Sequence, residues 1–175
     1  MARASQAPEY TRQLLNLAGC FDYPSSSLAK QLNVDLEELE NTHVHLFIND
    51  RGGAGAPPYA GCYLEQEDRQ RFMIDFSGIC RQQGIVISSG HPPDHIPAML
   101  ETLALLLAEA RQSPNLDIES LVNRYYRDWP ERFASALEEH DEVGFYAAAA
   151  KELQKTLKLL EACRTNHDVN CTVSI

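Results

Sequence analysis

The hydrophobic pattern of the chain is strongest over residues 91–111, HPPDHIPAMLETLALLLAEAR. Apolar side chains recur there at intervals of three and four residues, the spacing of one helix face: Ile96, Met99, Leu100, Leu103, Leu106, Leu107 and Ala110. Ala104, Leu105 and Ala108 widen this face to most of the circumference, which leaves Glu101, Thr102 and Glu109 for water. A helix that is apolar on most sides is normally packed by several neighbours, so we expect this one at the centre of the fold.

The start of this segment combines two prolines with the pair Asp94-His95. A carboxylate can accept hydrogen bonds from the free amides of a first helical turn, so we expect Asp94 to be the N-cap. Pro97 then falls within the first turn, where its missing N–H costs nothing. Ser113-Pro114 ends the segment, because the residue before a proline is biased away from helix. We therefore predict a helix from about Asp94 to Arg111.

Shorter segments elsewhere show the same spacing. Asp35 is a predicted N-cap with Glu38 as its capping-box partner, and Gly84 is a predicted helix end. The apolar run Ile85–Ile87 is the only strand-like piece before the tail, and one strand makes no sheet. The predicted helices cover about residues 10–21, 28–32, 36–47, 67–84, 116–126, 129–137 and 142–163. We expect an all-α, bundle-like single domain over residues 1–163, with seven or more helices around the central one, and a flexible tail over 164–175.

Composition narrows the function classes. The chain has 175 residues, enough for one sizeable core, and a formal net charge of −10, which argues against wrapping a nucleic-acid backbone. No stretch reaches about 18 uninterrupted apolar residues, and the first residues do not read as a secretory signal. The five cysteines form no C-x-x-C pair and are odd in number. Free thiols in a reducing cytoplasm are the simplest interpretation.

Two possible chemical sites are weak on inspection. The histidines His43, His45, His91 and His95, with Asp94, suggest a metal site, but prolines interrupt the i, i+4 pair and no H-E-x-x-H motif or cysteine cluster is present. The glycines at 52, 53 and 55 suggest a phosphate-binding loop, but no Gly-Lys-Ser/Thr follows and no strand precedes them. A histidine on a half-buried helix face and a plain surface loop are the favoured interpretations.

The Asp94-His95 corner has two interpretations. In the first, Asp94 caps the helix and His95 forms a hydrogen bond to a nearby loop. In the second, the pair forms a rigid recognition corner that faces a groove. The positive end of the helix dipole favours an ionised Asp94 and disfavours a charged His95 in either case.

Several motifs follow one another in a specific order along residues 10–161. They are Tyr23-Pro24, Leu46-Phe47 before a glycine-rich loop, Pro57-Pro58-Tyr59, Tyr63-Leu64, Pro92-x-Asp94-His95 before the Leu-rich helix, Trp129 with Phe133, and Phe145-Tyr146. With these motifs the chain resembles the TorD/DmsD/NarJ-type family of molybdoenzyme maturation chaperones. The resemblance implies a TorD-like helical fold and a non-enzymatic cytoplasmic chaperone. Such a chaperone binds the twin-arginine signal peptide, or N-terminal region, of a molybdopterin-containing reductase subunit and assists cofactor insertion before export.

The resemblance also implies which residues bind the signal peptide. They are Leu46, Phe47, Pro58, Tyr59, Pro92, Asp94 and His95, with Tyr23 as a weaker transfer. The chain departs from the family pattern at His91, where Glu often stands, and at Tyr59, where some members have Trp. Both differences fall where partner choice would be tuned. An acidic protein with a proline-aromatic groove would complement a peptide that is basic and then apolar.

A second function class stays open at this point. It is a helical nucleotide- or metal-binding enzyme that uses Asp94, His95 and the Gly52–Gly55 loop. The resemblance leaves weak GTP binding open as well, although no nucleotide motif is visible, and we expect no other cofactor. It also implies a monomer or a domain-swapped homodimer, for which the loop from Asn49 to Ala56 could be the exchange hinge.

Overall fold

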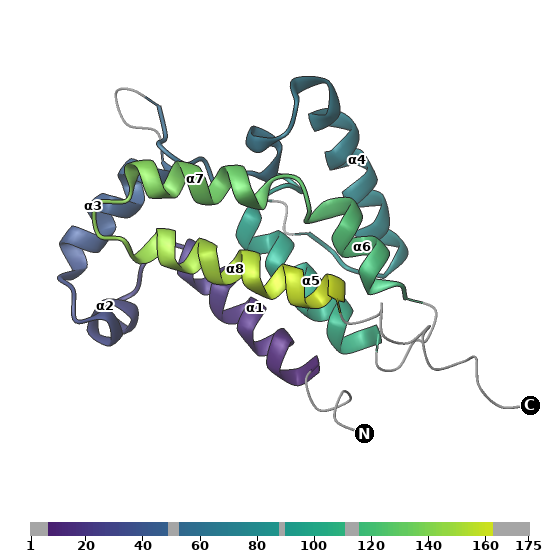
Figure 1. The fold of residues 1–175 in the computed structure, drawn as a ribbon, viewed down its shortest axis with the longest axis horizontal. Coiled ribbons are helices and arrows are strands. Elements are labelled where there is room, and N and C mark those ends of the chain that lie inside the picture. Colours follow the sequence, from purple (N-terminus) through teal and green to yellow (C-terminus); the bar gives the residue numbers. More distant parts are fainter. Residues whose placement is uncertain (1–6, 49–52, 88–89, 111–115, 163–175) are drawn as a thin grey trace, which may run out of the picture.

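The computed structural model describes residues 7–48, 53–87, 90–110 and 116–162. Within these ranges the protein is all-α, without a strand, so the predicted fold class is confirmed (Figure 1). The helices are α1 (Ala7–Phe21), α2 (Ser26–Leu32), α3 (Leu36–Phe47), the short 3₁₀ helix η2 (Ala60–Tyr63), α4 (Gln66–Gln82), α5 (Ile96–Ala110), α6 (Ile118–Tyr125), α7 (Pro130–His140) and α8 (Phe145–Ala162). The predicted tail 164–175 lies outside the described residues.

Helix α5 packs along α1 in the interior, as its pattern predicts. Its apolar face is narrower than predicted, however, because Leu105 and Ala108 are exposed. Thr102 was expected to face water and is buried, with its hydroxyl hydrogen-bonded to the Cys80 sulfur of α4. A buried hydroxyl is tolerated once it has a partner. The helix therefore presents one exposed stripe, and that stripe includes a large apolar side chain.

The other helices surround this pair. Figure 1 shows α7, α8 and α1 running side by side, with α2 and α3 at one end of the molecule and α4 and α6 towards the other. The largest buried side chains between them are aromatic, and the polar atoms of two of them, Trp129 and Tyr126, are hydrogen-bonded. The Trp129 indole N–H donates to the Tyr125 carbonyl at 2.8 Å, and the Tyr126 hydroxyl donates to the Met99 carbonyl. These bonds satisfy polar groups that would otherwise be costly to bury.

The helix ends follow the sequence signals in part. The Asp35 carboxylate accepts hydrogen bonds from the amides of Glu37 and Glu38, which confirms it as an N-cap. Gly84, with a φ of 70°, follows the end of α4. The prediction that Asp94 caps the central helix is wrong: α5 begins at Ile96, and the Asp94 carboxylate accepts from the backbone N–H of Gly61 instead.

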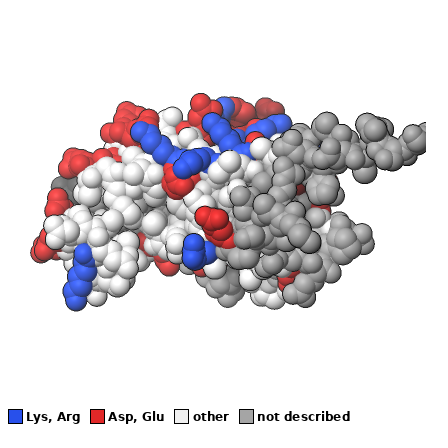
Figure 2. Space-filling view, turned by 60° about the horizontal axis from the view of Figure 1, so that its bottom comes forward, with Lys and Arg blue, Asp and Glu red and all other residues white. Residues whose placement is uncertain are grey.

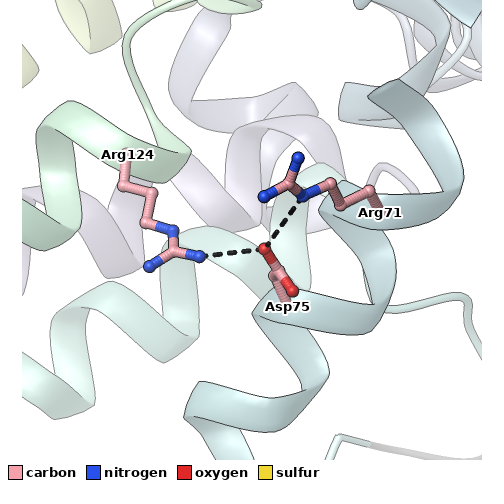
Figure 3. A network of polar contacts seen from close by, with 3 residues as sticks. All are labelled: Arg71, Asp75 and Arg124. Carbon is pink, nitrogen blue, oxygen red and sulfur yellow. Dashed lines mark hydrogen bonds and ion pairs between the residues drawn. The ribbon is translucent and has the colours of Figure 1, made fainter. Parts of the chain in front are cut away.

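A polar link joins α4 and α6 at the surface. An Asp75 carboxylate oxygen lies 2.9 Å from the Arg124 guanidinium and 3.9 Å from Nε of Arg71 (Figure 3). Beside it the rings of Phe76 and Tyr125 pack edge to face, with centroids 5.4 Å apart. The aromatic contact is the stronger part of this junction, because exposed ion pairs contribute little. No helix among the described residues is long and apolar enough to cross a membrane.

Candidate functional site

Two motifs that are more than thirty residues apart in the sequence meet at the start of α5. The amide of Ile96 donates to the Pro58 carbonyl at 2.9 Å, and the amide of Ala60 donates to the Asp94 carbonyl at 2.8 Å. These bonds flank Tyr59 and His95, which form an isolated antiparallel bridge. The proline-aromatic loop and the Asp-His corner are therefore one structural unit, held by backbone hydrogen bonds.

The Asp94 carboxylate lies inside this unit. It is 1% exposed, and it accepts from the Gly61 N–H at 3.1 Å. A Cβ atom on Gly61 would lie 2.6 Å from that carboxylate and 2.8 Å from Cγ of Arg69, so only glycine fits without a shift. Sequence reasoning missed Gly61, although its place two residues after Tyr59 was a usable signal. In this arrangement Asp94 positions the loop and does not face solvent.

The His95 ring contacts two other aromatic rings. The centroid of Tyr59 lies 5.6 Å from that of His95, and His91 stacks on the imidazole almost in parallel at 4.3 Å. Burial and the neighbouring His91 lower the pKa of His95 to about 4, and the carboxylate of Asp22 opposes this in part. The imidazole is therefore neutral near pH 7 and can both donate and accept a hydrogen bond.

A second aromatic group surrounds His43 of α3. Its ring lies 5.2 Å from Tyr23, 4.8 Å from Phe47 and 6.0 Å from Tyr146, centroid to centroid. Burial lowers the pKa of His43 to about 4, which Asp22 again opposes in part. Among the described residues its buried Nδ1 has no hydrogen-bond partner. The neutral imidazole thus behaves here mainly as one more ring of the aromatic core.

Asp22 is a charged residue whose carboxylate acts to raise the pKa of both His43 and His95. It follows α1 directly, is exposed, and its carboxylate accepts from the backbone N–H of Tyr23 at 2.8 Å. It therefore lies near both the Tyr23 motif and the Asp-His corner. Sequence analysis missed this residue, although it stands immediately before Tyr23-Pro24. A carboxylate in such a place offers a contact for a cation.

The structure separates the expected site residues into two groups. Tyr23 and Pro92 are exposed, and Tyr59 and His95 are half-buried, so these four are open to a ligand. Leu46, Phe47, Pro58 and Asp94 are buried. Leu46 and Phe47 belong to the core, and the Leu46 carbonyl accepts from the Ala56 amide at 2.8 Å. The four buried residues therefore lie beneath the surface of the candidate site and do not form part of that surface.

A groove opens beside His95. Its volume is about 240 Å³, and its lining contains two carboxylates and no Lys or Arg. Its lining residues are Asp22, Ile85, Val86, Ile87, His91, His95, Pro97, Ala98, Glu101, Thr102 and Leu105. Among the residues that the structure describes, no three His, Cys, Asp or Glu side chains gather as a metal site. The groove thus combines apolar side chains with two carboxylates.

Comparison with known proteins places the chain in a family. The family described as "Nitrate reductase delta subunit" matches residues 5–143, which is most of the chain. The chain belongs to this family. It comprises the NarJ- and TorD-type chaperones of redox enzyme maturation, so the resemblance seen in the sequence is confirmed.

A solved structure supports the fold. The "Crystal Structure Of A Putative Redox Enzyme Maturation Protein From Archaeoglobus Fulgidus" is 24% identical, covers 85% of this chain and 93% of that one, and superposes with a TM-score of 0.61. No curated protein matches the chain. As a member of the nitrate reductase delta subunit family, the chain is a chaperone whose partner is a redox enzyme.

Proposed function

We propose that this chaperone binds the twin-arginine signal peptide, or N-terminal region, of the catalytic subunit of a molybdopterin-containing reductase. It holds that subunit in the cytoplasm and assists insertion of the subunit's cofactor before export. The observation that supports the proposal is the bridge between Tyr59 and His95, which holds the proline-aromatic loop against a residue that lines the groove.

The chemistry of this edge suits such a peptide. A twin-arginine signal is basic and then apolar, and the groove combines the carboxylates of Asp22 and Glu101 with apolar side chains. The tyrosine ring and the neutral imidazole add apolar faces with polar edges, as is typical of protein interfaces. The net charge of −10 adds long-range attraction for a basic peptide. Figure 2 shows Asp and Glu side chains gathered at the end of the molecule that carries α2 and α3.

The experiment is a titration of a synthetic twin-arginine signal peptide against the wild type and single-site variants. Tyr59→Ala and His95→Ala should each weaken binding by about tenfold, which corresponds to about 1.4 kcal/mol, with little change in melting temperature. Ile74→Ala is a matched control, because Ile74 is an exposed apolar residue of α4 outside the groove lining. A wild type that does not bind the peptide would refute the function. If neither substitution weakens binding, the peptide does not bind at Tyr59 and His95.

A further inference from the structure

One wall of the groove is a stripe along α5. His95, Ala98, Glu101 and Leu105 recur every three or four residues and all line the groove. Ten residues of helix separate the first from the last, which is a length of about 15 Å. The wall is long enough to contact several residues of a peptide in sequence.

The opposite wall is the segment Ile85–Ile87, between α4 and α5. The Ile85 amide donates to the Cys80 carbonyl at 2.8 Å, and the Cys80 sulfur bonds Thr102, so this segment starts beside the middle of α5. His91 stacks on His95 at the start of α5. Ile85 therefore lies beside the middle of α5, and His91 lies beside its start.

The chemistry of the groove changes along its length. The end at the start of α5 carries Asp22, His91 and His95. Glu101 lies between the ends, about two turns along the helix. Leu105 at the other end is 51% exposed, and Val86 in the lining segment Ile85–Ile87 is 91% exposed. Two large apolar side chains that are so exposed beside one groove indicate a surface that a partner covers.

We propose that this groove binds a peptide segment in a fixed direction. A basic side chain lies at the end that carries Asp22, with Glu101 as its second carboxylate, and a large apolar side chain lies against Val86 and Leu105. The inference rests on the proposed function and adds the register of the peptide. It also assigns Asp22 as the residue that selects for a cation.

Charge decides between this occupant and a second copy of the chain. A two-fold contact through this groove would bring two copies of the same acidic lining together. Like charges opposed in an interface are unfavourable, and the lining contains no Lys or Arg to relieve them. A basic and apolar peptide complements both ends of the groove.

The test is a double-mutant cycle between protein and peptide. The probes are a synthetic peptide with two arginines followed by a leucine-rich stretch, the same peptide with both arginines changed to glutamine, and the same peptide with its leucines changed to serine. The protein variants are Asp22→Asn and Val86→Ser. Both positions are exposed, and asparagine can still accept the bond from the Tyr23 amide, so both variants are expected to fold. Glu109→Gln on α5 and Ile74→Ser on α4 are matched controls outside the groove lining.

The expected result is selective coupling. Asp22→Asn should weaken binding of the parent peptide by at least about tenfold, as expected for loss of a hydrogen bond to a charged group. It should leave the affinity for the glutamine peptide unchanged. Val86→Ser should weaken binding of the parent peptide and leave the affinity for the serine peptide unchanged. Both controls should bind as the wild type does.

Three results would overturn the inference. If the parent peptide binds and Tyr59→Ala weakens it, but Asp22→Asn and Val86→Ser do not, the groove assignment is wrong and the proposed function stands. If Val86→Ser abolishes self-association in sedimentation and leaves peptide binding intact, the occupant is a second copy. If the wild type binds none of the peptides, the proposed function fails as well.

Discussion

Gly61 donates its backbone N–H to the buried carboxylate of Asp94 at 3.1 Å, and this bond fastens η2 to the turn before α5. Together with the bridge between Tyr59 and His95, it makes a rigid support from two distant parts of the chain. The proposed binding surface then depends on a contact that is itself buried. Substitutions at this contact should change stability first and binding second.

Gly61→Ala should lower the free energy of unfolding by about 1–3 kcal/mol, because its Cβ would lie 2.6 Å from the Asp94 carboxylate. Urea denaturation would measure this loss. In an Asp94→Ala background the loss should be smaller, since the crowding oxygen is gone. Gly78→Ala is the control: nothing lies within 4 Å of a Cβ there, and alanine should stabilise α4 by about 0.5–1 kcal/mol. Equal losses from Gly61→Ala in both backgrounds would show that the contact is not what excludes alanine.

Asp94→Asn should leave peptide affinity within about threefold of wild type, because the side chain is covered and its oxygen can still accept from Gly61. A direct contact with an arginine would instead cost about 1.5–3 kcal/mol and make binding less sensitive to salt. Isothermal titration at two salt concentrations distinguishes the two results. The larger loss, with an unchanged melting temperature, would mean that Asp94 becomes accessible when the peptide binds.

Leu103→Ala should destabilise the protein by about 2–5 kcal/mol, since Leu103 is fully buried in the central helix. Leu105→Ala on the same helix removes the same atoms from an exposed position and should cost much less. Chemical denaturation of the two variants compares them directly. Similar losses at both positions would mean that the buried face of α5 is wrongly assigned.

His43→Phe should reduce the loss of stability at acidic pH. The pKa of His43 is lowered to about 4 by burial, while in the unfolded chain it titrates near 6.5. Between these values the unfolded state binds more protons, so the free energy of unfolding falls as the pH falls from 6.5 to 4. Phenylalanine cannot take a proton, and the fall from pH 7.5 to pH 4.5 should be smaller by about 1–2 kcal/mol. Parallel pH profiles for the two proteins would contradict this assignment.

Asp75→Asn should change the free energy of unfolding by less than about 1 kcal/mol, although it breaks the polar link between α4 and α6 (Figure 3). The link is exposed and screened by salt, and the rings of Phe76 and Tyr125 still hold the junction. Phe76→Ala should cost about 3–5 kcal/mol by comparison. Thermal melts at low and high salt would show a small effect of Asp75→Asn that shrinks further with salt.

Local sequence patterns were sufficient for the helices and their order. The spacing of apolar residues predicted α5, and Asp35 and Gly84 marked helix ends where the structure has them. These are interactions between residues three or four apart, which a linear pattern can show. The order of the motifs was likewise enough to indicate the family.

Tertiary structure decided which residues form the surface of the site. Asp94 had the spacing of a helix cap, but its carboxylate bonds Gly61 instead, because the loop after Pro58 packs beside it. Leu105 matched the predicted apolar face of α5, but it is exposed and lines the groove. Asp22 carries no local signal of its own, and only its position near His43 and His95 points to a role. Burial and proximity depend on contacts between distant segments, and a residue's own neighbours in the sequence do not specify them.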